Sequence, residues 1–565
     1  MSVGRTNFEV QTCRDGRWAM QEVFADEDEA RTQAKKLLGN KACEGVRILR
    51  NWMRGDGQIT ETEIFRETRV VSTEGAVHVS SIETAPPPCE SLDDYFGPAS
   101  RDAVNRLLRA YLEKATLTPT ELMYSYKELR RLQEKDTLVP SAVDRVAQLQ
   151  CRAAGSDPRL RAREIFKSID EMSARARRVE ALALPPIKAR LSEVMGRLPS
   201  LDPSEDPGYL VRATLARDLL GLRNWVSKLE RLCALAAADS DPAALAVLDD
   251  VISDLLGSSV VQDVLGDQPG LGAAIIAMLD LADGAMAPAR GQVGEAASIL
   301  NRLFAERKLP AARATLIDRA HRQIRSSNPL VRDQPAKEVE AFRLLVGRLV
   351  SPPGFVHGPE SAEALTWRQT RMVEQGGGAG RRAALEATFR AMPDRATGLV
   401  YLCAMAETEY GAEQAEAVQE LLDLVVRARG MPELCDRTLP PKERLARATR
   451  AHAAVLASAF PEPLRRRVAD AIDTMLEQYL LREQIIDKLD NPASTLRDRA
   501  VRLVQFCAAG VLPEGRALGH ARHRVLDLLR QPHFDAHFID GCADAAQAQR
   551  MLRDFHQLLV KGGFK

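Results

Sequence analysis

An almost unbroken helical pattern dominates this chain from about residue 100 to its C-terminal end. In one stretch, apolar residues step by four, four, three and four positions and so share one helix face: Leu464, Val468, Ile472, Met475 and Tyr479. A cap residue followed by proline marks helix starts at residues 118–121, at Asp241-Pro242 and at Asn491-Pro492. Gly510 follows an apolar run and is a candidate C-terminal cap. The sequence therefore predicts a mainly α fold.

The first 70 residues carry a different pattern. Asp15-Gly16 favours a tight turn between two strands, and Asp26 with Glu29 favours a helix start that continues to about Leu38, where Gly39-Asn40 ends it. Alternating apolar residues predict strands over residues 8–12, 18–24, 46–52 and 59–66. We expect a small α+β module of order β-β-α-β-β, with one helix covering a four-stranded sheet.

Loop signals divide the chain into four parts. Residues 71–98 contain three consecutive prolines at 86–88, which favour an extended linker that could also dock its Leu92–Phe96 stretch. A loop near residue 355 separates the helical region. We expect an α+β module over 1–70, a Pro-rich linker over 71–98 and helical domains over 99–355 and 356–565. No fixed repeat is evident, which leaves irregular helical hairpins or separate bundles as alternatives.

The charge balance argues against a nucleic-acid partner. The chain has 78 basic and 78 acidic residues, whereas nucleic-acid-binding proteins carry a basic excess or stripe. The basic runs at residues 175–178 and 465–467 are interpreted as solvated helix faces. The apolar stretch 271–279 is too short to cross a bilayer and ends at Asp280. We therefore expect protein partners, no nucleic acid and no membrane insertion.

Cysteine usage and the N-terminal segment indicate the compartment. The nine cysteines are odd in number, scattered and without a Cys-x-x-Cys motif, which is typical of reduced thiols. Residues 1–11 lack the apolar run of a secretory signal. These observations predict a cytoplasmic protein, and the abundance of Ala and Arg hints at a bacterial source.

Histidines gather near the C-terminus, where five of the nine lie beyond residue 519. His520 and His523 are three residues apart and His533 and His537 are four apart, so each pair would share a helix face, as zinc and iron ligands do. No His-Glu-x-x-His motif accompanies them. Metal binding at these four residues is one hypothesis, and ordinary surface histidines are the simpler alternative.

Two other motifs have structural explanations. The glycine-rich segment 376–380 precedes a predicted helix but lacks the preceding strand and the Lys-Ser/Thr of a nucleotide-binding loop, so we interpret it as a flexible interhelical loop. Arg54-Gly55-Asp56 is interpreted as a hairpin turn. The sequence thus predicts no catalytic and no cofactor-binding residue.

These observations leave three hypotheses. The first is a non-enzymatic intracellular scaffold or adaptor that acts through protein–protein interaction along its helices. The second is a metal-binding or ligand-regulated helical enzyme that uses the C-terminal histidines with zinc or iron. The third, which overlaps with the first, is a regulatory protein that senses a small ligand through its N-terminal module.

Overall fold

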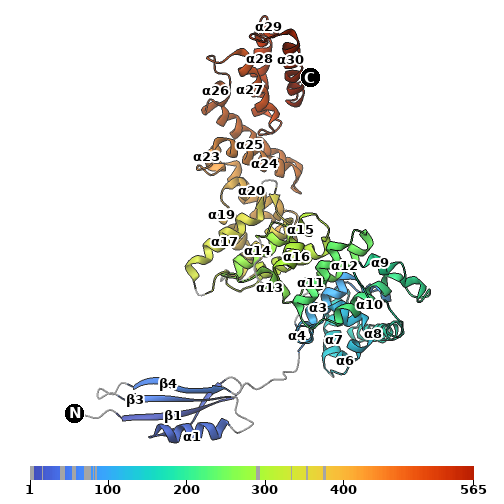
Figure 1. Cartoon of the computed structure of the whole chain (residues 1–565). Coiled ribbons are helices and arrows are strands. Elements are labelled where there is room, and N and C mark those ends of the chain that lie inside the picture. Colours follow the sequence, from blue (N-terminus) through green and yellow to red (C-terminus); the bar gives the residue numbers. More distant parts are fainter. Residues whose placement is uncertain are drawn as a thin grey trace.

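The computed structural model describes residues 5–14, 17–38, 45–53, 59–68, 78–80, 82, 86–135, 137–287, 293–332, 334–351, 354–372 and 377–564. Within them it contains thirty α-helices, one short 3-10 helix and six strands. The prediction of a mainly α protein with a small N-terminal α+β module is confirmed (Figure 1).

The N-terminal module has the predicted order of elements. They are β1 (Arg5–Arg14), β2 (Arg17–Phe24), α1 (Glu27–Leu38), β3 (Gly45–Met53) and β4 (Ile59–Thr68). The strands form an antiparallel sheet of order β2-β1-β3-β4. The turns predicted at 15–16, 39–40 and 54–57 lie outside the described residues.

Helix α1 covers one face of this sheet. The buried residues of that layer form a hydrophobic cluster of their own, made of Phe8, Val10, Ala30, Ala34, Val46 and Ile48. On the other face, Arg47 Nε donates to Gln11 Oε1 at 2.8 Å and Asn51 Nδ2 donates to Glu9 Oε2 at 3.2 Å. The alternation of apolar and polar residues along β1 and β3 therefore separates a covered face from a polar face.

The helices of the 92–282 region are α2 (Leu92–Tyr95), α3 (Pro98–Leu107), α4 (Arg109–Ala115), α5 (Pro119–Tyr124), α6 (Tyr126–Gln133), α7 (Leu138–Ala154), α8 (Pro158–Glu180), α9 (Ser192–Met195), α10 (Pro207–Leu220), α11 (Trp225–Ala238), α12 (Pro242–Leu256), α13 (Val260–Leu265) and α14 (Leu271–Ala282). The 3-10 helix is η1 (Leu198–Ser200). Some successive helices pack against each other, as α7 and α8 or α11 and α12 do, and some helices distant in the sequence also pack together, as α5 and α10 do. These contacts cover their apolar stripes.

The second half continues with α15 (Gly294–Ala305), α16 (Pro310–Arg325), α17 (Pro335–Leu349), α18 (Pro359–Met372), α19 (Gly377–Ala391), α20 (Arg395–Met405), α21 (Glu409–Glu413), α22 (Ala415–Val426), α23 (Met431–Leu434), α24 (Pro441–Ala457), α25 (Glu462–Arg482), α26 (Ile485–Leu489), α27 (Leu496–Ala508), α28 (Arg516–Leu529), α29 (Phe534–Phe538) and α30 (Ala545–Lys561). A two-stranded ribbon of β5 (Val350–Ser351) and β6 (Gly354–Phe355) separates α17 from α18. Figure 1 shows these helices stacked in chain order toward the C-terminus.

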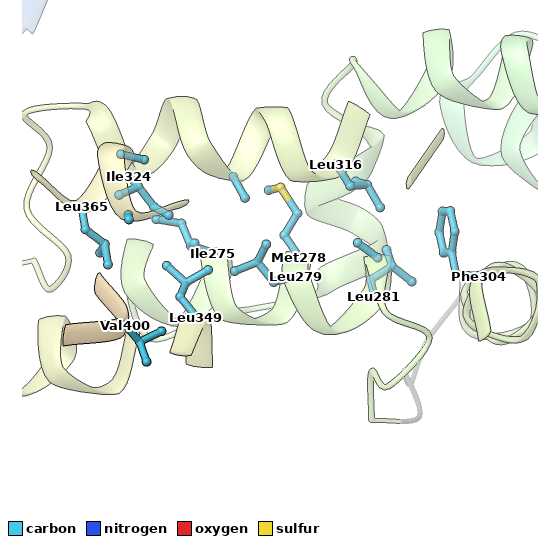
Figure 2. Close-up of a cluster of buried hydrophobic side chains, with 14 of the residues drawn as sticks. Ile275, Met278, Leu279, Leu281, Phe304, Leu316, Ile324, Leu349, Leu365 and Val400 are labelled. Atoms are coloured by element: carbon cyan, nitrogen blue, oxygen red, sulfur yellow. The ribbon is translucent and has the colours of Figure 1, made fainter. Parts of the chain in front are cut away.

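One large hydrophobic cluster extends through this stack from Phe96 to Phe555. Figure 2 shows its middle, where Ile275 and Leu279 of α14 lie between side chains of α16, α17, α18 and α20. The side chains labelled there come from both sides of residue 355: Ile275, Met278, Leu279, Leu281, Phe304, Leu316, Ile324 and Leu349 before it, and Leu365 and Val400 after it. The four domain limits given above stay predictions.

The end of the linker docks onto the helices. Ser91 caps α2 with a capping box, and Phe96, which follows α2, is only 7% exposed. Its ring lies 5.0 Å from that of Tyr124 and 5.2 Å from that of Tyr209. Phe96 is therefore part of the core of the helical region, and Leu92 and Tyr95 are partly buried against that core.

Of the helix boundaries predicted beyond residue 100, three are confirmed and one is wrong. Thr118 and Asp241 cap α5 and α12, and Gly510 follows α27 with a φ of 65° that favours glycine. Asn491-Pro492 does not start a helix, because the Asn491 side chain accepts a hydrogen bond from the Ala493 amide in a local turn. The helix starts instead after Thr495, whose hydroxyl accepts from the Asp498 amide.

Two helices begin on a carboxylate supplied by another helix. Asp249 of α12 accepts from the amides of Ala311 and Ala312 at 2.7 and 2.8 Å, at the start of α16. Asp473 of α25 accepts from the amides of Arg516 and Ala517 at 2.7 and 3.2 Å, at the start of α28. Neither α16 nor α28 has a side-chain cap of its own, so these carboxylates satisfy amides that would otherwise lack partners.

Replacing Asp473 with alanine is expected to lower the free energy of unfolding by about 2 kcal/mol, because a cap is lost and two partly buried amides lose their acceptor. Urea unfolding followed by circular dichroism measures this loss. Asp470, an exposed residue one turn earlier on α25, provides the control, since D470A should change stability by less than about 0.5 kcal/mol. Equal effects of the two substitutions would contradict the capping role.

Candidate functional site

The four C-terminal histidines lie on the surface of the last helices. His520 and His523 are on α28, His533 caps α29 and His537 lies within α29, and all four are exposed. His523 Nε2 lies 3.8 Å from Asp527 Oδ1. Within the described residues, no group of three or more His, Cys, Asp or Glu side chains could hold a metal ion. Metal binding at these residues stays a prediction.

The closest histidine–carboxylate pair of the described residues lies elsewhere. His357 Nε2 is 3.3 Å from Asp283 Oδ2, and its Nδ1 is 3.2 Å from a guanidinium nitrogen of Arg313. Arg348 donates to the same carboxylate at 2.7 Å. Burial alone would raise the pKa of Asp283, but the nearby His357 imidazole and hydrogen bonds from Arg348 and Arg313 hold it well below its ordinary value. This cluster ties α14, α16 and α17 to the segment after β6.

His321 of α16 is buried and belongs to a second polar contact. Its Nε2 lies 2.8 Å from Ser361 Oγ, which itself donates to the Val356 carbonyl at 2.7 Å. The hydroxyl proton is thereby used, so His321 donates from Nε2. Burial, reinforced by the charges of Arg325 and His357, lowers the pKa of His321 to about 4.

This shift predicts acid sensitivity. The unfolded chain protonates the imidazole near pH 6.5, roughly the ordinary value, whereas the folded chain does so only near pH 4, so stability is lost as the pH falls between these values. We expect the free energy of unfolding to fall by about 2–3 kcal/mol more in the wild type than in H321Q between pH 7 and pH 4.5. Urea unfolding at both pH values measures the difference. The exposed control, H523Q, should follow the wild type, and an identical pH profile for H321Q would refute the assignment.

The most deeply buried charges surround α5, and the sequence reasoning missed them. Lys228 of α11 and Glu121 are 1% and 0% exposed at their side chains and lie 2.6 Å apart. Arg101 of α3 donates from Nε to Asp254 of α12 at 3.1 Å, and Asp254 also accepts from Thr120 of α5. A signal for the first pair was present, because Lys228 falls on the apolar face of α11 with Trp225, Leu229 and Leu232. These pairs hold helices together and expose no reactive group.

A groove opens on the surface between α19, α20 and α22. It has a volume of about 570 Å³ and an apolar floor that includes Phe389, Met392, Leu421 and Leu424. Leu424 is 48% exposed although it is apolar. Charged side chains of both signs form the rim: Glu386, Arg390, Arg395, Glu420, Asp423 and Arg427. An apolar floor with a charged rim is the arrangement that protein-binding grooves use.

A second cavity lies among α3, α5, α6, α7 and α8. It has a volume of about 160 Å³, and its accessible lining is almost entirely apolar. Leu107, Val143, Ile165 and Met172 are among the buried side chains that form its wall. The sequence could not indicate it, because a cavity depends on how well side chains from separate helices fill the space between them.

The cysteines of the described residues whose side chains are placed are all free thiols, in agreement with the prediction of reduced cysteines. Burial raises the pKa of Cys233, Cys403 and Cys435 to about 12, so these three remain protonated at neutral pH. They therefore serve as small apolar core residues.

The other sequence motifs have mixed outcomes. Arg175 is buried and its guanidinium pairs with Asp93 and Glu205 at 2.7 and 2.6 Å, so interpreting its run as a solvated face was wrong for this residue. The predicted glycine-rich loop is also wrong from Gly377 onward, where α19 already begins, because successive residues there continue the helical hydrogen bonding. Residues 54–56 and residue 376 lie outside the described residues.

Among the described residues, no helix combines the length and the apolar character that crossing a membrane requires. Comparison of the chain with protein-family models, with curated proteins and with solved structures found no match in any of the three.

Proposed function

We propose that this chain is a non-enzymatic scaffold or adaptor that acts through protein–protein interaction along its helical body. The observation that carries the proposal is the amount of exposed surface. The accessible area of the whole chain, which includes the N-terminal module and the linker as well as the helices, is 30,360 Å² for 62.2 kDa, whereas a compact monomer of this mass exposes roughly 20,000 Å². A stack of helical hairpins gives up compactness and gains an extended surface on which partners bind.

The groove between α19, α20 and α22 is the contact surface that we assign to this function. Ala417, Glu420, Leu421 and Leu424 follow one another at steps of three, one and three residues, so one face of α22 lines the groove. Such a floor accepts the apolar face of a partner helix, and the rim charges select its orientation. Most of the specificity would then come from the rim and most of the affinity from the floor.

A pull-down with matched variants tests the proposal. Tagged wild-type chain and the L424E and L481E variants are expressed in the source cell, and bound proteins are quantified by mass spectrometry. Leu481 is 52% exposed on α25 and lies outside the groove, so it matches Leu424 in exposure. We expect a partner that the wild type and L481E enrich equally and that L424E enriches at least tenfold less, because a carboxylate in place of an apolar side chain must be desolvated when the partner covers the floor.

Two results would count against the proposal. A partner that L424E retains in full would remove the groove from the function. Failure of the wild type to enrich any protein specifically over the tag alone would remove the scaffold proposal itself.

A further inference from the structure

We infer that the cavity among α3, α5, α6, α7 and α8 is a binding site for a short alkyl chain, of about six carbon atoms. This inference does not depend on the proposed scaffold function. It rests on the lining of the cavity, its volume and the state of the few polar groups around it.

The lining selects against water and polar ligands. Helices α3, α5, α6, α7 and α8 contribute aliphatic and thioether side chains, and the accessible surface inside is almost wholly carbon. A water molecule in a cavity needs about two to four polar partners, so a cavity of this kind stays dry. An apolar group is the one occupant whose transfer from water the cavity favours.

The polar residues at the border have partners of their own. Gln150 Nε2 donates to the Pro86 carbonyl at 2.8 Å, and its Oε1 accepts from Arg161 Nε at 2.9 Å. Gln133 donates to Ser173 at 3.3 Å, and Ser100 donates to the Asp94 carbonyl at 2.9 Å. Because these groups bond to one another and to the backbone, the cavity offers its occupant apolar contact and no buried hydrogen bond.

The volume sets the size of the occupant. Protein interiors are packed at a density that leaves few voids larger than one water molecule, and a void of about 160 Å³ is far above that size. A dry engineered cavity of about 150 Å³ in another protein holds a benzene ring. A chain of about six carbons therefore has the volume that fills this cavity. The head group of that chain would lie at the border, where Gln150 and Arg161 are found.

The linker forms part of the cavity wall, so a bound ligand would also affect how the linker is attached. Pro86, Cys89 and Tyr95 line the cavity, and Arg145 of α7 donates to the Ile82 carbonyl at 2.9 Å. The segment that leads to the N-terminal module is thus held against the same cavity. A bound alkyl chain adds contacts to this wall and strengthens its attachment to α7.

Calorimetric titration of the full chain with 1-alkanols from butanol to octanol, and with hexanoate beside 1-hexanol, tests the inference. Affinity should increase about fourfold for each added methylene until the cavity is full near six carbons, and then stay level. Hexanoate and hexanol distinguish an acid from an alcohol head group. Binding of either supports the site, whereas binding of neither, or affinity that ignores chain length, overturns it.

Matched substitutions locate the binding. Ala142 of α7 lines the cavity, so A142L should fill it and weaken hexanol binding at least tenfold without lowering the melting temperature. A103L on α3 fills it from the other side and replaces A142L if that variant does not fold. Ala174, exposed on α8 and outside the lining, gives the control A174L. Unchanged binding by the filled variants, or equal loss in A174L, would overturn the inference.

Discussion

Replacing Lys228 with methionine is expected to lower the free energy of unfolding by about 3–5 kcal/mol. The Lys228 ammonium donates to Glu121 Oε1 at 2.6 Å and also to the Thr116 carbonyl. Methionine fills nearly the same volume but supplies no charge, so Glu121 would be left buried and unpaired. Hydrogen exchange of the α5 and α11 amides measures the loss where it arises.

The double variant E121Q/K228M separates the lost charge from lost packing. It should recover most of the stability, because neither member then carries a buried charge and the new amide oxygen can still accept from Thr118 in place of the Glu121 carboxylate. K167M, which removes an ammonium that is 80% exposed on α8, should change stability by less than about 0.5 kcal/mol. A loss below about 1 kcal/mol in K228M would refute the structural role of the pair.

The K228M variant should also respond to pH. Burial raises the pKa of Glu121, and removing the Lys228 charge raises it further. The folded chain then holds a proton that the unfolded chain releases, so stability increases as the pH falls toward 5. The destabilisation of K228M relative to the wild type should thus be smaller at pH 5 than at pH 8, and the opposite order would contradict the assignment.

Replacing Asp254 with alanine is the second large effect, and we expect a loss of about 3 kcal/mol. Asp254 accepts from Arg101 Nε at 3.1 Å, from Thr120 Oγ1 at 2.5 Å and from the Thr120 amide at 3.2 Å. Arg101 is 2% exposed and would keep only Asp250, at 3.4 Å, as a counter-charge. Hydrogen exchange of the amides in α3 and α5 measures this loss of stability.

Two further variants show which interaction causes the loss of stability in D254A. D254N keeps an acceptor for Thr120 and removes only the charge, so its loss should be smaller than that of D254A by about 1 kcal/mol. D318A breaks an exposed pair with Arg322 on α16 and should cost less than about 0.5 kcal/mol. If D254A were no more destabilising than D318A, the buried contacts of Asp254 with Arg101 and Thr120 would not stabilise the fold.

The fold class could be predicted because it depends on local sequence patterns. The alternation in the first 70 residues and the 3.6-residue periodicity beyond residue 100 each report how one segment meets a neighbour. Thr118 and Asp241 were found as caps because a cap is satisfied within its own turn. Asp249 and Asp473 were not found, because they cap helices that lie far ahead in the sequence.

For the candidate sites too, the sequence indicates local spacing but not the contacts between distant segments. The spacing of His520, His523, His533 and His537 indicated residues that share helices, but spacing does not bring two helices to a common point. The groove beside Leu424 and the cavity beside Ala142 are made by packing between helices, so only the tertiary structure reveals them. Arg175 was interpreted as solvated since its partner Asp93 lies in the linker, 82 residues earlier.

The extended helical body is the claim on which the proposed function depends, and small-angle X-ray scattering of the full chain in solution tests it most directly. A compact chain of 565 residues has a radius of gyration of about 24 Å. The account predicts a value well above this, with a distance distribution that has a long tail. A value near 24 Å with a symmetric distribution would contradict it, because a compact body would not expose the surface that a scaffold needs.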